Sequence, residues 1–396
     1  MTDPKSRIAS GPAGLGVRST LQLLVFCAYL QLAWVKSARA EDHVSVKWQD
    51  YQEDDGRVRV LSKYLGVEKK INESFALRLH GVHDSISGAT PTGSTGASGD
   101  ELVITEVTDV REAGVVDLDW TRGIHKTSFQ FAHSKESDFL SKGYAIYNTS
   151  EYNKRNTGVS YGLSFVDDEI KPSFFDEAET KESLDAYVGL SQVIDANTVA
   201  SLNFTYGKFE GYLNDPYKLI AKDVEVIPGF FLFQEAPEHR PDERLRRIWF
   251  ANVKRFFPEL RGSIDFDYRY FNDTWGVESH TFDLEWYQKV GDKLTLRPSY
   301  RYYNQNAASF YFADLNGTDI DPLEPVVGVA PFYSADYRLA KMETETYGLK
   351  AIYKIAEQVS VDVSWERYKM KGKDGVTHEG AFPKADILTI GGVWWF

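Results

Sequence analysis

The feature that most constrains the fold is a strict alternation of apolar and polar side chains over long stretches. In residues 263–270, apolar side chains occupy every even position and polar or charged side chains every odd position. Residues 200–206 and 359–366 follow the same pattern. Successive side chains of a β-strand point to opposite faces, so this pattern predicts strands with one apolar and one polar face.

The length of these segments narrows the class of protein. Strands of soluble proteins average about five to six residues. Many segments here have about ten or more, the length that a tilted strand needs to cross a bilayer. We therefore predict an all-β fold, a transmembrane antiparallel β-barrel of about 16 strands, with 14 strands or a soluble β-sandwich as alternatives. The predicted strands are 44–53, 57–69, 73–83, 107–120, 122–134, 143–152, 156–166, 184–195, 197–208, 243–255, 260–272, 277–290, 293–304, 342–355, 357–370 and 385–396.

The connections between these strands support the count. In a single-chain barrel, long loops lie on the extracellular side and short turns on the periplasmic side. The long segments 84–106, 167–183, 209–242, 305–341 and 371–384 all fall on one side of the predicted barrel. The faces predicted to point inward are charged, which indicates a solvated or salt-bridged lumen, or a ring that selects ions. These inward residues are Asp265, Asp267, Arg269, Asp283, Glu285, Arg297, Arg301, Asp362 and Glu366.

The first 40 residues have the three parts of a secretory signal. Basic residues precede an apolar run at 21–30, and Ser37–Ala40 ends in an A-x-A cleavage pattern. We expect residues 1–40 to be a cleaved signal peptide and residues 41–396 to form the barrel; an N-terminal membrane anchor is the alternative. Cleavage would remove Cys27, the only cysteine, so we expect neither a disulfide nor a thiolate metal site in the mature chain.

The predicted location and partners follow from charge and from the last strand. A net charge of −13 argues against nucleic acid as a partner. Residues 388–396 alternate and end on Phe396, which resembles the C-terminal signal of bacterial outer-membrane barrels. The resemblance implies a place in the cell outer membrane, contact with its lipid, and recognition by the barrel-assembly machinery.

One segment carries possible cofactor chemistry. Asp84-Ser-Ile-Ser87-Gly88-Ala89-Thr90 resembles the motif at which a periplasmic FMN transferase attaches flavin mononucleotide. The resemblance implies that Thr90 bears covalent FMN, with Asp84, Ser87, Gly88 and Ala89 as the recognition set. A flexible loop rich in Gly, Ser and Thr is the alternative interpretation.

The whole chain resembles a family of uncharacterised Gram-negative outer-membrane proteins, domain of unknown function 3570. The resemblance rests on residues 84–93, on Ser334–Leu339, and on the Trp-rich C-terminal strand. It implies a setting of extracytoplasmic electron transfer, with a periplasmic FMN transferase and redox proteins as partners.

Three functions therefore remain open. The barrel could carry FMN in electron transfer, act as a passive porin-like channel without a cofactor, or dock a structural partner. We predict no catalytic residues, and hence no enzyme, and no metal site, because His80 and His83 would face opposite sides of a strand. The charged residues between 238 and 247 are expected to form a solvated cluster at the rim.

Overall fold

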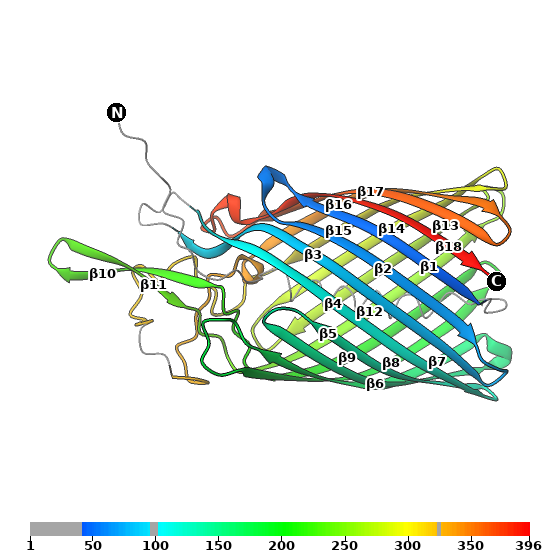
Figure 1. The fold of residues 1–396 in the computed structure, drawn as a ribbon, viewed down its shortest axis with the longest axis horizontal. Helices are drawn as coiled ribbons and strands as arrows, with labels where there is room; N and C mark the ends of the chain where they lie inside the picture. Colours follow the sequence, from blue (N-terminus) through cyan, green and yellow to red (C-terminus); the bar gives the residue numbers. More distant parts are fainter. Residues whose placement is uncertain (1–41, 96–101, 323–325) are drawn as a thin grey trace.

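A computed structural model describes residues 42–95, 102–322 and 326–396. Within these residues, sixteen strands form a closed barrel and two more form a separate hairpin (Figure 1). The barrel strands are β1 His43–Glu53, β2 Arg59–Lys70, β3 Phe75–Thr95, β4 Leu102–Arg122, β5 His125–Lys135, β6 Phe139–Tyr152, β7 Thr157–Ile170, β8 Glu179–Asp195, β9 Thr198–Gly211, β12 Glu243–Phe257, β13 Gly262–Asp273, β14 Glu278–Val290, β15 Leu294–Gln305, β16 Met342–Ala356, β17 Val359–Gly372 and β18 Lys384–Trp395. The hairpin consists of β10 Leu219–Ile227 and β11 Phe230–Pro237.

Each barrel strand pairs antiparallel with its neighbours in the chain, and β9 pairs with β12 across the hairpin. The first and last strands close the barrel, with His43 opposite Trp395 and Glu53 opposite Ala385. The side chain of Gln49 donates to Thr389 Oγ1 at 3.1 Å across this seam. The closed sheet has no free edge within the barrel. A sheet that spans a membrane must be closed in this way, because the bilayer core offers no hydrogen-bond partners for unpaired backbone groups.

The alternating apolar and polar residues of each strand lie on the outer and inner faces of the barrel wall, respectively. Leu202, Leu349, Trp365 and Ile390 are each about half exposed on the outer surface. Their polar neighbours along the strands point into the lumen. A continuous apolar exterior of this kind is the surface that a barrel presents to lipid.

The structure confirms all sixteen predicted barrel strands, to within a few residues at most ends, and corrects three of the predicted loops. The loop predicted at 167–183 is shorter, because β7 ends at Ile170 and β8 begins at Glu179. Residues 84–106 were expected to form a long loop, but residues 84–95 and 102–106 belong to β3 and β4, which are paired strands of 21 residues each; residues 96–101 lie outside the described residues. Residues 209–242 contain the β10–β11 hairpin, which projects beyond the barrel (Figure 1). In both segments the backbone hydrogen bonds are made by strand pairing, between β3 and β4 and between β10 and β11.

The two ends of the barrel differ. The long connections 212–242, 306–341 and 373–383 gather at one end, whereas short turns join the strands at the other (Figure 1). Short 3-10 turns occur at η1 Asp54–Gly56, η2 Asn153–Arg155, η3 Tyr337–Leu339 and η4 Glu379–Ala381. No helix in the described ranges has the length and apolar character needed to cross a membrane. The predicted signal peptide, residues 1–40, lies outside the described residues.

Candidate functional site: the lumen and its loop cap

Oppositely charged side chains line the lumen in pairs that join neighbouring strands. Asp283 of β14 lies opposite Arg301 of β15, and their side chains are 2.7 Å apart. Phe282 and Leu284, on either side of Asp283, are about 40% exposed on the outer wall, so the charged pair faces inward. Further ion pairs on this arc include Lys254–Asp265 at 2.6 Å, Arg297–Glu285 at 3.3 Å and Lys350–Asp362 at 2.7 Å.

Charged side chains elsewhere on the wall pair in the same way. Arg78 lies 2.8 Å from Asp119, and Arg246 lies 2.7 Å from Asp185. The predicted ionised lumen is therefore confirmed. Each of these pairs joins one cation to one anion, so the paired residues make the lumen wall polar and add little net charge to it.

The loops at the long-loop end are joined by a buried ionic network, which we call the loop cap network and define as Asp215, Lys218, Glu238, Arg240, Asp336 and Arg338. Arg240 contacts Glu238 at 2.7 Å and Asp336 at 2.8 Å. Arg338 contacts Asp215 at 2.5 Å and also pairs with Asp336. The network therefore connects the 212–242 loop to the 306–341 loop, which follow different strands of the barrel.

A third element of the cap is the end of β3. The buried ammonium of Lys218 donates to the backbone carbonyl of Pro91. Tyr337, from the same loop as Asp336, packs with Met342, Met370 and Phe382 in an apolar cluster beneath the cap. Phe382 belongs to the 373–383 loop, so three long loops and the β3–β4 extension form one layer over the mouth of the barrel.

The buried charges of this layer have shifted pKa values. Burial raises the pKa of the Glu238 carboxyl to about 7. Burial acts in the same direction on Asp336, but Arg338, Lys218 and Arg240 outweigh it and hold the pKa of Asp336 well below its usual range. Burial lowers the pKa of the Lys218 ammonium. Asp336 is thus the anion around which the cations of the cap are arranged.

The charged cluster expected to be solvated at the rim is instead partly buried. Glu238 and Arg240 belong to the loop cap network, and Arg246 pairs with Asp185 inside the barrel. Arg244 pairs with Asp273 and its guanidinium lies 4.3 Å from the centre of the Trp275 ring. The partners of these residues come from distant strands and loops, so the local charge pattern did not show that they would be buried.

The residues of the flavin motif lie in β3, where the structure gives several of them structural contacts. Asp84 is fully buried and pairs with Arg111 of β4 at 2.6 Å. Thr90 is opposite Thr105 and only 2% exposed, whereas Ser87 is exposed. The strand geometry therefore does not bring the side chains of the motif to one accessible surface.

Two glycines of this segment have backbone roles. Gly88 has a φ of +121°, and a Cβ at this position would overlap the carbonyl oxygen of Arg57. Gly93 has a φ of +99°, and a Cβ there would lie 2.7 Å from the carbonyl oxygen of Ala335 in the cap. Only glycine tolerates these conformations readily, so the fold itself accounts for both residues.

Three buried carboxylates, those of Asp109, Glu136 and Asp138, lie within 4.8 Å of one another at the end of β5. Asp109 accepts hydrogen bonds from the backbone and hydroxyl of Ser137, at 3.3 and 3.0 Å. Asp138 accepts one from the Tyr217 hydroxyl. These contacts hold the β5–β6 turn to β4 and to the 212–242 loop.

Comparison with solved structures identifies proteins of similar fold. CdiB from Acinetobacter baumannii aligns over 90% of this chain and 61% of its own, with 8% identity and a TM-score of 0.51. A bacterial polysaccharide outer membrane secretin aligns over 91% and 100%, with 8% identity and a TM-score of 0.48. OmpT of Vibrio cholerae, in a form lacking loop L8, aligns over 90% and 98%, with 11% identity and a TM-score of 0.42.

These likenesses concern the fold alone, which is that of outer-membrane β-barrels. No curated protein matches the chain. The family described as "Protein of unknown function (DUF3570)" matches residues 18–105 and 103–392, nearly the whole chain. The chain therefore belongs to the DUF3570 family.

Proposed function

We propose that this protein is an outer-membrane channel whose ionised lumen admits ions or small polar solutes and whose loop cap controls entry. The observation that carries this proposal is the inward set of paired charges behind an apolar exterior. Barrels of about 16 strands enclose a lumen wide enough for water unless side chains or loops fill it. A charged wall favours hydration of such a lumen.

The apolar exterior supports the membrane location. Side chains such as Leu349 and Ile390 are about half exposed all around the wall. Exposure of this much apolar surface to water would be unfavourable by about 25 cal/mol per Å². A lipid bilayer removes that cost, and the long loops would then face the cell exterior.

The test is conductance of the purified full chain in a planar bilayer. We expect discrete current steps for the wild-type protein. Arg301→Gln leaves Asp283 without its partner in the lumen, so it should shift the reversal potential in a salt gradient toward cation selectivity. The matched control is Arg261→Gln, because Arg261 pairs with Asp292 at an exposed turn, 3.1 Å away.

The outcomes of this test are distinct. Selectivity that changes with Arg301 and not with Arg261 supports a conducting lumen. The channel is contradicted if the inserted wild type and Arg301→Gln give no current and Asp336→Asn, which should loosen the cap, gives none either. That result would favour a barrel that docks a structural partner.

Covalent FMN at Thr90, with a role in electron transfer, is the second proposal, and the sequence motif supports it. The burial of Thr90 sets a condition: a periplasmic transferase would have to act before β3 and the loop cap assemble. The Thr90 hydroxyl oxygen would attack the FMN phosphorus of FAD, the pyrophosphate bond would break, and AMP would leave with the displaced phosphate. The hydroxyl proton would pass to solvent, and the protein would gain the mass of one FMN minus one water. The modified barrel would carry electrons and would not itself be an enzyme.

Intact mass measurement of protein co-produced with a periplasmic FMN transferase tests this second proposal. The control is Thr92→Ala, because Thr92 lies two residues along the same buried face and donates to the Val103 carbonyl at 3.2 Å. A flavin adduct in the wild type and Thr92→Ala, but not in Thr90→Ala, supports attachment at Thr90. An unmodified wild type contradicts it.

A further inference from the structure

The outer wall has a row of residues that interrupts the apolar exterior. Across β2–β6, register places Leu65, Gly81, Gly114, His133 and Lys142 opposite one another in succession. The preceding row, toward the long loops, is Lys63, His83, Glu112, Lys135 and Leu140. The following row, toward the short turns, is apolar: Val67, Leu79, Val116, Phe131 and Tyr144.

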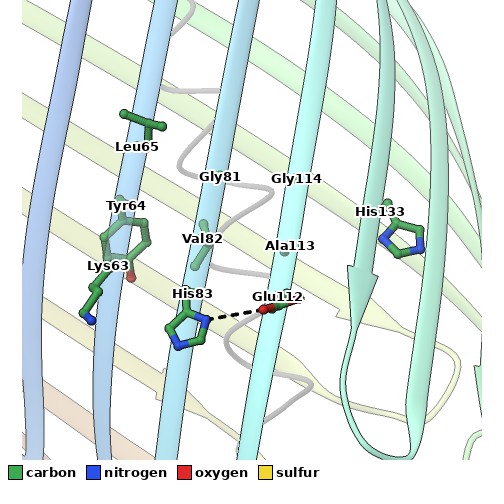
Figure 2. Close-up of a pocket in the computed structure, with 10 residues that line it drawn as sticks. All are labelled: Lys63, Tyr64, Leu65, Gly81, Val82, His83, Glu112, Ala113, Gly114 and His133. Carbon is green, nitrogen blue, oxygen red and sulfur yellow. Dashed lines mark ion pairs between the residues drawn. The ribbon is translucent and has the colours of Figure 1, made fainter.

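The two glycines leave a hollow in this wall. Gly81 and Gly114 are cross-strand partners, and the hollow has a volume of about 510 Å³. Figure 2 shows it bordered by Leu65 on one side and by His83 and Glu112 below the glycines. A Cβ at Gly81 would have no atom within 4 Å, and the nearest atom to one at Gly114 would be 3.8 Å away. The backbone does not require glycine at either position, and the hollow is simply the space left by absent side chains.

The charges around the hollow are mostly basic, although the chain carries a net charge of −13. Within the described part of the chain, Lys63, Lys135 and Lys142 form no ion pair. Glu112 lies 3.8 Å from His83 and is the one acidic residue in the two rows. Elsewhere on the rim, Lys208 pairs with both Glu210 and Glu243. Register places Glu112 opposite Lys135 and Asp167 of β7 opposite Lys142, whereas Lys63 lies between Trp48 and His83. Lys63 is therefore the lysine of this patch that has no acidic residue directly opposite it.

We propose that the hollow binds one membrane lipid with a phosphate-bearing, anionic headgroup. An acyl chain lies over Gly81 and Gly114, in continuity with the apolar row below, and the phosphate oxygens accept hydrogen bonds from Lys63 and Lys135. The boundary between apolar and charged rows is where the headgroup of a bilayer lipid lies. This inference rests on the membrane location of the proposed function.

The test is native mass spectrometry of the full chain in detergent with phosphatidylglycerol, and with phosphatidylcholine of the same acyl chains. We expect a retained phosphatidylglycerol adduct on the wild type. Gly81→Leu with Gly114→Leu fills the hollow and should abolish it. Lys63→Gln and Lys135→Gln should each weaken binding about fivefold, as expected for loss of one cation near a lipid headgroup.

The matched control is Gly392→Leu. Gly392 faces outward in β18 between Val46 and Val361, and its nearest Cβ contact would be an ordinary 3.7 Å. It adds the same side chain to the wall away from the hollow, so lipid binding should not change. Retention of barrel structure in each variant is checked by its heat-modified mobility on a gel.

Three results would overturn the inference. Equal retention of both lipids shows that the phosphate-binding charge is irrelevant. Full competition by glycerol phosphate shows a site for a free anion instead of a lipid. A dimer that is lost in the double glycine variant shows that a second copy occupies the hollow. Flotation with liposomes distinguishes failure of the lipid site from failure of the proposed function. A protein that floats with liposomes but gives one of these three results contradicts only the lipid site, whereas a protein that does not float contradicts the membrane location itself.

Discussion

Asp336 of the 306–341 loop accepts a hydrogen bond from Arg240 of the 212–242 loop at 2.8 Å, although the two residues are 96 positions apart. The same carboxylate also pairs with Arg338. One buried anion thus connects two loops that leave the barrel at different strands. Asp336 is therefore the residue whose substitution tests how far the ionic contacts hold the two loops together.

Asp336→Asn should loosen the cap while leaving the barrel intact. The change leaves Arg240 and Arg338 buried with less compensating charge, which typically costs about 3–5 kcal/mol. We expect faster amide hydrogen exchange in residues 333–340 and unchanged exchange in β12–β17. Asp292→Asn is the control, since the Asp292 side chain is 95% exposed at a turn. Equal protection in the wild type and Asp336→Asn would show that apolar packing alone holds the loops.

The stability of the cap should fall as pH rises from about 4.5 to 7. The pKa of Glu238 in the folded cap is about 7, above its ordinary value of 4.5, because burial disfavours the charged form. The folded cap therefore binds more protons than the unfolded loops in this window, and its stabilising contribution is lost as pH passes through 7. Asp336 does not oppose this trend, because its pKa is held below its usual range and it stays ionised throughout.

Hydrogen exchange of residues 333–340 at pH 5.5 and 7.5, corrected for the intrinsic rate, measures this dependence. Glu238→Gln should make the protection nearly equal at the two values, since the amide mimics the protonated acid. Asp292→Asn should keep the dependence of the wild type. A cap whose protection rises with pH would contradict the assignment to Glu238.

Gly88→Ala and Gly81→Ala should differ although both glycines lie in β3. Alanine at Gly88 would need a φ of +121° and would overlap the backbone of Arg57, so we expect a loss of about 1–3 kcal/mol. Alanine at Gly81 meets open space and should be neutral or slightly stabilising. Urea-dependent gel mobility of the folded barrel gives both values. Similar stabilities would show that β3 relaxes around residue 88.

The alternation of residues 263–270 was sufficient to predict β13, its inward carboxylates and its apolar outer face. The same reasoning gave all sixteen barrel strands, because each face meets a uniform environment of lipid or water along its length. Local pattern is reliable where the surroundings are uniform. The charged lumen followed from the same argument and needed no knowledge of which charges would pair.

The cap could not be predicted in this way. Residues 84–95 are rich in Gly, Ser and Thr and carry no apolar alternation, so they indicated a loop. In the structure they pair with β2 and β4, and Lys218 and Ala335 contact them from loops far along the chain. The flavin motif falls in this segment, and its Asp84 and Gly88 have structural contacts that no local spacing could show. The hollow at Gly81 and Gly114 was missed because it appears only when the register joins two strands.

The seam between β1 and β18 joins residues more than 300 positions apart, so it forms only when both ends of the barrel sequence come together. Until then, both strands present unpaired backbone groups, and each is a template for addition of a strand from another molecule. Contacts of such long range also form slowly. Closure of the seam removes both templates, so barrel formation and association between chains compete for the same backbone groups.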